Sequence, residues 1–409
     1  MKKVELLAPA QNKKSIDAVI PYANAVYFGS DALNMRMNAD NIPLSELRSA
    51  VSYCHEHNLR AYLTTNVIIY ENELKYLENL LASAKNAEID AVILHDLAAV
   101  EIAREMDLSF HISTQASVSN SRAARFYEKL GAERIILARE CSLAQIREIG
   151  QQLKHTEIET FVHGAQCTSV SGRCYFSAYV YDDPVCSANR GQCLQPCRHK
   201  WTLKHFSGAE IDYSEGFFLN SKDLCMIEHI PELIDAGIAS FKIEGRMRDP
   251  HYIETVARCY CEAIDAVYAD KYTPANVESW LGQLKKVYNR GFSTGFYFGR
   301  PGPEDISVDV AGNQAETKKV QIGKVIAYYR GVQVAKIVLH TGRLQLGDEI
   351  IFEGSKRGGY VHQKIESMQY KTKSITMTPP IPSNGSILLT TKVSQPVKKG
   401  DWVYRYLEK

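Results

Sequence analysis

The sequence lacks the features that would place it in a membrane or in the secretory pathway. It contains no apolar run near the ~18 residues that a membrane-spanning helix requires. Its first residues, MKKVELLAPAQNKKS, hold only a short apolar stretch, whereas a secretory signal needs a longer apolar core and a cleavage site. We therefore expect a cytoplasmic protein with no membrane partner.

The sequence also lacks the local patterns of the common hydrolases. The zinc-protease string H-E-x-x-H is absent. Ser171 or Cys167 could be paired with His163 as nucleophile and base, but no G-x-S-x-G elbow surrounds either of them. A peptidase is therefore the alternative interpretation and not the favoured one.

The net charge of the chain is small, but it is unevenly distributed along the sequence. The whole chain carries only +1, with a hydrophobic content of 45% that is ordinary for a globular protein. Residues 318–409 hold 16 Lys+Arg and 6 Asp+Glu, a balance of +10, so residues 1–317 carry −9. Such an asymmetry indicates contact with nucleic acid, and a merely solvated basic surface is the alternative.

Strand-like and helix-like patterns alternate over residues 1–300. Amphipathic stretches such as 43–58 and 71–87 repeat apolar residues at helical spacing. Short apolar runs typical of buried parallel strands cover 4–8, 25–29, 60–66, 91–96, 109–114, 134–140, 160–164 and 240–246. Eight strands in this pattern predict an α/β fold, a TIM-like (β/α)8 barrel, with a cysteine-rich insertion at about 164–239. A doubly wound open sheet is the alternative.

The pattern changes after residue 300. Residues 301–317 are expected to form a linker, and 318–409 show short β-branched and aromatic runs separated by turn residues. These runs predict a small all-β domain, a closed barrel. The strings LQLGDEI and VKKGDWVYR resemble the second domain of translational GTPases, a β-barrel that often contacts tRNA, and this resemblance implies that residues 318–409 bind tRNA. The expected phosphate-contacting and base-stacking residues are Lys318, Lys319, Lys356, Arg357, Lys371, Lys373, Lys398, Lys399, Tyr328, Tyr329 and Tyr370.

Ten cysteines in a reducing compartment argue against a disulfide framework. Four of them form a dense group with the spacing Cys-x6-Cys, eighteen residues, Cys-x3-Cys: Cys167, Cys174, Cys193 and Cys197. Four convergent thiolates suit an iron–sulfur cluster, and the wide first spacing suits a tetrahedral zinc site less well. Zinc and a site without metal stay open as alternatives.

The cysteine segment carries a family resemblance. ETFVHGAQCTSVSGRCYFS at 159–177 closely resembles the signature of the U32 family, collagenase-like peptidases of unknown catalytic type. Further matches follow in order along the chain: ELLAPA at 5–10, AVYFG at 25–29, STQAS at 113–117, GQCLQPCR at 191–198, LNSKDLC at 219–225 and FKIEGRM at 241–247. Two positions depart from the family pattern, Gln11 and Ser30, where glycine is common.

The resemblance implies hydroxylation of RNA. Better-understood relatives are prephenate-dependent tRNA and ribosomal RNA hydroxylation proteins, and ubiquinone hydroxylases with a [4Fe-4S] cluster. It therefore implies a [4Fe-4S] cluster held by the four cysteines above, with Cys225 as an alternative ligand. Size and the β domain are most similar to the tRNA type, which forms 5-hydroxyuridine at the wobble position. The implied partners are tRNA and prephenate; ribosomal RNA or a small molecule as substrate, and a second copy or a paralogue as partner, are left open.

The remaining candidates come from the carboxyl ends of the predicted strands, where barrel enzymes place their chemistry. His163 is expected to act as acid or base near the cluster, or else to bond a loop carbonyl. The other expected catalytic residues are Asn66, Gln115, Glu244 and Arg246, the last two with a structural ion pair as the alternative. Expected substrate-binding residues are Arg36, Arg139 and Lys242, because cationic groups, arginine above all, hold the carboxylates of prephenate.

Overall fold

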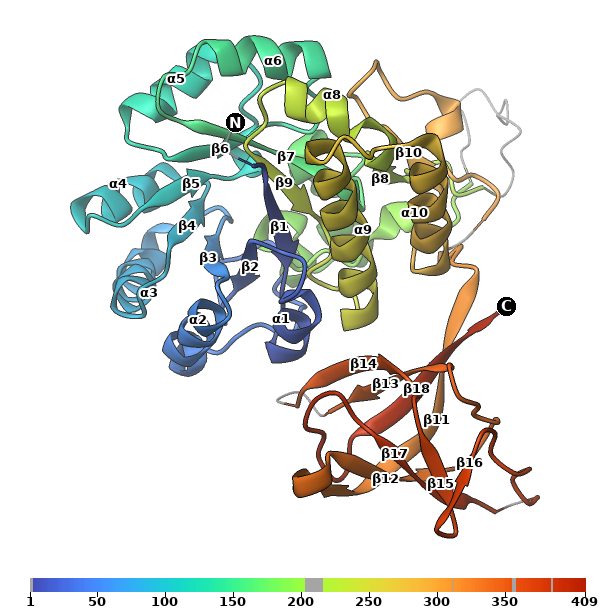
Figure 1. The fold of residues 1–409 in the computed structure, drawn as a ribbon. Coiled ribbons are helices and arrows are strands. Elements are labelled where there is room, and N and C mark those ends of the chain that lie inside the picture. The colour runs from blue at the N-terminus through green and yellow to red at the C-terminus, as the bar shows by residue number, and fades with distance from the viewer. Residues whose placement is uncertain (1–2, 203–215, 311, 355–357, 384) are drawn as a thin grey trace. The chain divides into compact units, whose positions relative to one another are not determined.

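The computed structural model describes residues 3–202, 216–310, 312–354, 358–383 and 385–409 (Figure 1). The chain divides into two compact units: Met1–Gln11 with Val19–Ala315, and Asn12–Ala18 with Glu316–Lys409. Most of the segment 301–317, expected as a linker, therefore belongs to the first unit. None of the helices in the described ranges is long and apolar enough to cross a bilayer.

The first unit is built on eight parallel strands. They are β1 (Glu5–Pro9), β2 (Ala25–Gly29), β3 (Arg60–Thr65), β4 (Ala91–Leu94), β5 (Phe110–Ile112), β6 (Arg134–Ile136), β7 (Glu157–Gly164) and β9 (Ser240–Ile243). Neighbours pair in order, and β9 pairs with both β7 and β1, which closes the barrel. Each strand overlaps one of the apolar runs above, so the (β/α)8 prediction is confirmed.

Helices follow these strands along the chain. They are α1 (Lys13–Val19), α2 (Leu47–Glu56), α3 (Leu74–Asn86), α4 (Leu97–Glu105), α5 (Ser121–Lys129), α6 (Leu143–Gln151), α8 (Ile230–Asp235), α9 (Pro250–Tyr268) and α10 (Pro274–Lys286). In α3 the buried residues are Leu77, Leu80, Leu81 and Ala84, so the helical spacing places one apolar face against the barrel. Asp96 and Asn120 begin α4 and α5 by accepting hydrogen bonds from backbone N–H groups of the first turn.

The insertion lies between β7 and β9. Its described part contains a 3-10 turn (Val170–Gly172), α7 (Phe176–Tyr181) and β8 (Asp223–Cys225), before α8. Strand β8 pairs antiparallel with the end of β7, and β10 (Phe292–Ser293) pairs parallel with β8. Residues 203–215 of the insertion lie outside the described residues.

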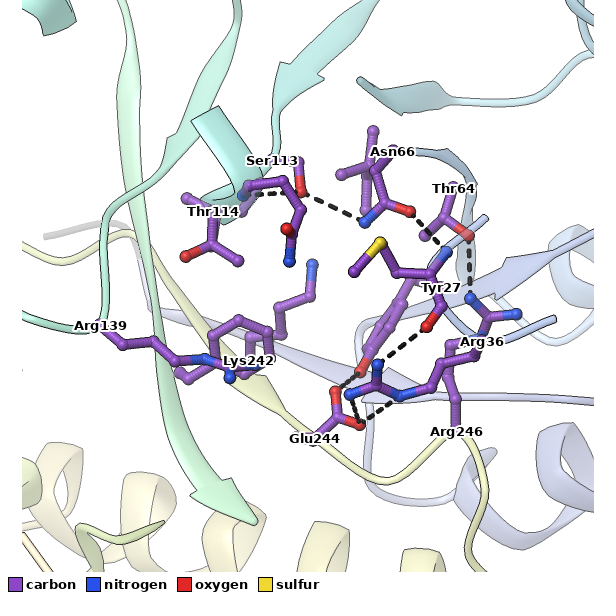
Figure 2. Close-up of a pocket in the computed structure, with 15 residues that line it drawn as sticks. Tyr27, Arg36, Thr64, Asn66, Ser113, Thr114, Arg139, Lys242, Glu244 and Arg246 are labelled. Atoms are coloured by element: carbon purple, nitrogen blue, oxygen red, sulfur yellow. Dashed lines mark hydrogen bonds and ion pairs between the residues drawn. The ribbon is translucent and has the colours of Figure 1, made fainter. Parts of the chain in front are cut away.

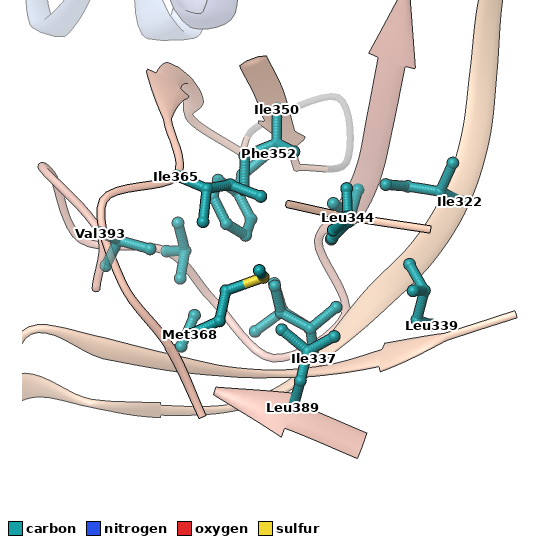
Figure 3. Packing of buried hydrophobic residues seen from close by; sticks show 14 of the residues in the cluster. Ile322, Ile337, Leu339, Leu344, Ile350, Phe352, Ile365, Met368, Leu389 and Val393 are labelled. Carbon is teal, nitrogen blue, oxygen red and sulfur yellow. The ribbon is translucent and has the colours of Figure 1, made fainter. Parts of the chain in front are cut away.

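The second unit contains an antiparallel sheet around one apolar core. Its strands are β11 (Thr317–Tyr329), β12 (Val334–Leu339), β13 (Glu349–Glu353), β14 (Tyr360–Lys364), β15 (Met368–Tyr370), β16 (Lys373–Ile375), β17 (Ile387–Lys392) and β18 (Trp402–Glu408). The order is β14-β13-β18-β11-β12-β17-β15-β16, and no pairing of described residues joins β14 to β16. Figure 3 shows side chains such as Ile337, Phe352 and Leu389 meeting in the core. The predicted all-β domain is confirmed.

Candidate functional site at the barrel mouth

A pocket of about 40 Å³ lies at the carboxyl ends of the barrel strands (Figure 2). Its lining comes from strand ends and the loops that follow them: Tyr27, Met35, Arg36, Thr64, Asn66, Ile93, Ser113, Thr114, Gln115, Ile136, Arg139, Phe161, Lys242, Glu244 and Arg246. The fold therefore brings together all of the predicted catalytic and substrate-binding residues outside the cysteine group, except His163.

Arg36 and Glu244 form an ion pair at one side of this pocket. Nε and Nη2 of Arg36 donate to Glu244 Oε1 at 3.1 and 2.8 Å. The Tyr27 hydroxyl donates to the Ile243 carbonyl at 2.8 Å and lies 3.5 Å from Glu244 Oε2. Burial alone would raise the pKa of Glu244, but the charges of Arg36 and Arg139 lower it below its ordinary value. Glu244 is therefore an anion with its own counter-ion.

Arg246 is a buried cation held by neutral groups only. Its side chain donates to Thr64 Oγ1 at 3.1 Å and to Asn34 Oδ1 at 3.0 Å, and it also reaches Asn41. Its Nε has no partner among the described residues. Because the guanidinium is only 2% exposed, burial lowers its pKa to about 10. A methyl group at Gly29 would come within 2.3 Å of Arg246 Nη2, which explains the glycine at the end of β2.

Arg139 also lacks a counter-ion. Its guanidinium carbon lies 4.5 Å from the ring centroid of Phe161, and no hydrogen bond or ion pair joins it to any residue in the described ranges. Figure 2 shows its side chain extended along the pocket with no dashed contact. By contrast, Lys242 Nζ donates to Glu159 at 2.7 Å and lies 4.3 Å from the Tyr27 ring centroid.

The charges around this pocket do not balance. Four cations line it, Arg36, Arg139, Lys242 and Arg246, with Glu244 as the acidic residue of the lining. Glu244 compensates Arg36 and Glu159 compensates Lys242, so Arg139 and Arg246 are left without carboxylate partners in the part of the chain that the structure describes. Uncompensated cations in a largely buried pocket favour an anionic ligand, and guanidinium groups suit carboxylates.

A second pocket, of about 110 Å³, shares a wall with the first and is called the cysteine pocket below. Met35, Arg36, Gln115 and Arg139 line both. The other residues around it come from the insertion and its surroundings: Ala165, Gln166, Cys167, Gly172, Ala188, Gly191, Cys193, Gln195, Cys197, Arg198 and Met247. Three of the four predicted thiol ligands thus lie beside the barrel mouth.

The four predicted thiols are electrostatic neighbours. Burial raises the pKa of Cys193, and nearby Cys167 and Cys174 raise it further. Burial likewise raises the pKa of Cys197, with added contributions from Cys167 and Cys193. Cys174 does not line the pocket; its backbone N–H donates to Asn189 Oδ1 at 3.0 Å.

This donor set fits an iron–sulfur cluster. Among the described residues, no three of these sulfurs lie within 4.8 Å of one another. Four sulfurs around a single zinc ion, each about 2.3 Å from the metal, would lie closer together than that. A cluster needs four convergent thiolates with room between them, and its binding would deprotonate these thiols. Cys167, Cys174, Cys193 and Cys197 would hold it.

The cysteine segment is anchored to the strand ends without a metal. Ser171, at φ 42°, donates its N–H and its hydroxyl to the two carboxylate oxygens of Glu140, at 2.8 and 3.1 Å. Arg173 donates to the Gln115 carbonyl at 2.9 Å and lies 3.0 Å from His95 Nε2. The hydroxyl of Ser171 is therefore engaged by a carboxylate and not by a histidine.

His163 lies apart from both pockets, which contradicts its predicted place at the barrel mouth. Its ring packs against the aromatic rings of Tyr252, Tyr260 and Phe292, and Nδ1 lies 3.4 Å from the Tyr260 hydroxyl. A register shift between Phe161 and His163 places His163 opposite Ile243, on the outer side of the barrel wall. Burial lowers the pKa of His163 to about 3, so it is a neutral core residue.

Cys225, the alternative ligand, also lines neither pocket. It is 5% exposed and lies opposite His163 in the β7–β8 pairing. Burial raises its pKa to about 12. Cys225 therefore lies apart from the pocket that Cys167, Cys193 and Cys197 line.

Several residues that line or support these two pockets were not predicted from the sequence. Thr64 and Ser113 are polar residues at the ends of apolar strands, and that signal could have identified them. Asn34 holds Arg246 from a loop and has no local sequence signal. Arg198 lines the cysteine pocket and is the last residue of the GQCLQPCR match, which could have identified it.

One hydrolase-like string was also overlooked, GFSTG at 291–295. Its Ser293 lies in β10, donates to Asp305 and accepts the Gly295 N–H at 3.0 Å. A turn follows it, whereas a nucleophile elbow requires a helix. The string is therefore not an elbow.

Comparison with known proteins identifies the family. Residues 11–307 match the profile of Peptidase family U32. An uncharacterized protease of Methanocaldococcus jannaschii is 42% identical over 413 residues, covering 99% of this chain and 98% of that protein. A collagenase of Porphyromonas gingivalis is 35% identical, covering 98% and 97%. The tRNA hydroxylation protein P1 of Bacillus subtilis is 35% identical, covering 88% and 86%. The chain belongs to the U32 peptidase family.

Proposed function

We propose that the chain is an iron–sulfur-dependent tRNA hydroxylase that forms 5-hydroxyuridine at the wobble position without dioxygen, with prephenate as co-substrate. One observation carries the proposal. Within the described ranges, Arg139 and Arg246 have no carboxylate partner, and they lie in a pocket that shares a wall with the cysteine pocket. Prephenate is a dicarboxylate, so it would compensate both guanidinium groups.

The pocket residues have separate tasks in this reaction. Arg139, stacked on Phe161, and Arg246, fixed by Thr64 and Asn34, would each hold one carboxylate. The amides of Asn66 and Gln115 offer donors and acceptors for the edge of a pyrimidine turned out of its strand. The fixed positions of these groups align the two substrates, which lowers the entropic barrier.

Hydroxylation also needs redox chemistry. Replacing C5–H by C5–OH adds one oxygen atom and removes two electrons from the pyrimidine, so an oxygen donor and an electron acceptor are required. A [4Fe-4S] cluster on the four cysteines would supply one-electron transfer beside the pocket. Arg36 and Gln115, which line both pockets, would separate it from the substrates.

The second unit would bind the RNA backbone. Residues 318–409 carry a balance of +10, and lysine and arginine contacts to phosphate give affinity that falls with salt. Of the tyrosines expected to stack on bases, Tyr328 and Tyr370 pack against the core, whereas Tyr329 is 48% exposed. Lys356 and Arg357 lie outside the described residues.

A deletion strain tests the proposal. We expect tRNA nucleosides from that strain to lack 5-hydroxyuridine and its derivatives by mass spectrometry. Wild-type protein should restore them and Arg139→Gln should not. Arg147→Gln is the matched control, because Arg147 is exposed and paired with Asp235. Unchanged 5-hydroxyuridine in the deletion strain, or wild-type protein that contains no iron after oxygen-free purification, would refute the proposal. A change confined to ribosomal RNA nucleosides would move the activity to that substrate.

A collagenase-like hydrolase is the second candidate, favoured by the collagenase among the relatives. It needs a nucleophile beside a base. Ser171 bonds to Glu140, and His163 is a neutral residue in the core. Incubation of the oxygen-free protein with gelatin and with tRNA separates the two candidates, and we expect no gelatin cleavage.

A further inference from the structure

Arg198 links the two halves of the cysteine group. It directly follows Cys197, and its guanidinium donates to the carbonyl of Gln166, which directly precedes Cys167. It also lines the cysteine pocket together with both of these cysteines. One side chain therefore joins the loop of the first cysteine pair to that of the second.

The other hydrogen-bond partners of Arg198 among the described residues are all neutral, and the nearby carboxylate of Asp223 is already paired with Arg290 at 3.0 Å. Nη1 donates to Asn220 Oδ1 at 3.0 Å, to the Ser221 carbonyl at 2.7 Å and to Ser221 Oγ at 3.1 Å. These contacts fix the guanidinium without compensating its charge.

Neighbouring arginines differ from Arg198 in this respect. Arg190, in the same segment, pairs with Glu73 and does not line the pocket. Arg36 does line it but is paired with Glu244, and Arg139 belongs to the proposed dicarboxylate site. Arg198 is thus the cation of this pocket whose charge has neither a carboxylate partner nor an assigned ligand among the described residues.

We propose that Arg198 is a positioning residue that joins the two cysteine pairs and, through its uncompensated charge, raises the reduction potential of the cluster held there. This inference rests on the proposed function. A cluster bound by four thiolates gains negative charge on reduction, and a fixed cation beside it favours the reduced form. Net charge nearby is one of the factors that set cluster potentials.

The test uses the full chain, loaded with iron and sulfide under oxygen-free conditions. The midpoint potential is measured by reductive titration followed by electron paramagnetic resonance. For Arg198→Gln we expect the ratio of reduced to oxidised cluster at the wild-type midpoint to fall about tenfold, a shift of about 59 mV to more negative potential for one electron. Arg198→Lys keeps the charge and should keep the midpoint, while retaining less iron because the fork of hydrogen bonds is lost.

A second pair of variants keeps Arg198 and tests the effect of its charge. Ser221→Asp places a carboxylate against Nη1, so the midpoint should shift in the same direction as in Arg198→Gln. Ser221→Asn is its uncharged match and should leave the midpoint near the wild-type value. Arg190→Gln removes a compensated arginine of the same segment and should change the midpoint little.

The outcomes separate the inference from the function on which it rests. Wild-type protein without iron would refute the proposed cluster itself. A loaded wild type whose midpoint matches those of Arg198→Gln and Ser221→Asp would overturn the role of Arg198 alone. Equal shifts in Ser221→Asp and Ser221→Asn would overturn it as well, and this pair decides the matter if Arg198→Gln holds no cluster.

Discussion

The interiors of the two units contain different kinds of side chain, with a charged network in the barrel and an apolar cluster in the second unit. Inside the barrel, Glu159 accepts from Arg134 at 3.1 Å and from Lys242 at 2.7 Å, and Arg134 also pairs with Glu5. These four side chains are at most 5% exposed. The second unit is built around a cluster of aliphatic and aromatic side chains (Figure 3).

The interiors of the two units therefore depend on different kinds of interaction. A buried ion network contributes little net stability, because desolvation of the charges offsets their attraction. The barrel nevertheless keeps one, and its member Lys242 also lines the pocket that contains Arg139 and Arg246. We infer that this network holds Lys242 and Tyr27 in place for binding, whereas the core of the second unit is an apolar cluster.

The largest expected effect comes from breaking the network. Glu159→Ala leaves Lys242 without its carboxylate partner, and we expect the barrel to lose about 3–5 kcal/mol of unfolding free energy. Chemical denaturation followed by a probe in the barrel measures this. The double variant with Lys242→Met should lose less than the sum of the single variants. If Glu159→Ala lowers the unfolding free energy by less than about 1 kcal/mol, the ion pairs of Glu159 do not stabilise the barrel.

A packing defect in the second unit should lower the stability of that unit and leave ligand binding by the barrel unchanged. Leu389 is 2% exposed, and Leu389→Ala should cost about 3 kcal/mol through lost burial and the cavity left behind. Because no barrel residue changes, the affinity for a dicarboxylate should stay within twofold of wild type. Calorimetric titration and denaturation of the same sample measure both quantities. Weakened dicarboxylate binding would show that the barrel pocket depends on packing in the second unit.

The pH dependence of stability should follow His163. Its pKa is about 3 in the folded protein and 6.5 ordinarily, so the unfolded chain binds the proton and the folded chain does not. Stability should therefore fall as the pH drops from 6.5 towards 3, by about 2 kcal/mol at pH 5. His163→Phe removes this contribution, so its curve should be flatter there and parallel to wild type above pH 7. Parallel curves over the whole range would place the titration elsewhere.

The smallest effect is expected on the basic surface. Lys371 and Lys373 are exposed, and reversing both to glutamate should weaken tRNA binding and reduce its salt dependence by about one unit per lost phosphate contact. The midpoint of barrel unfolding should not change. Lys75→Glu on α3, where Lys75 pairs with Glu78, is the matched control. Identical salt slopes for all three proteins would exclude a phosphate contact at these positions.

Much of the barrel could be predicted from the sequence, because parallel strands buried on both sides appear as separate apolar runs. The polar residues after those runs converge at one end by topology, so Asn66, Gln115 and Glu244 could be proposed as neighbours. What could not be predicted depends on loops and on local irregularities. A register shift in β7 removed His163 from the mouth. The loop that carries Asn34 gave Arg246 neutral partners, and not the ion pair with Glu244 that was the alternative interpretation.

The closure of the barrel by direct pairing of β7 with β9 has one more consequence. The cysteine insertion leaves the barrel wall and returns to it at adjacent strands, so its ends are held close together whatever its length. Exchange or lengthening of this segment during evolution would leave the wall intact, since loop closure costs grow only slowly with length. The same scaffold could thus accept insertions of different length and composition at this point of the wall.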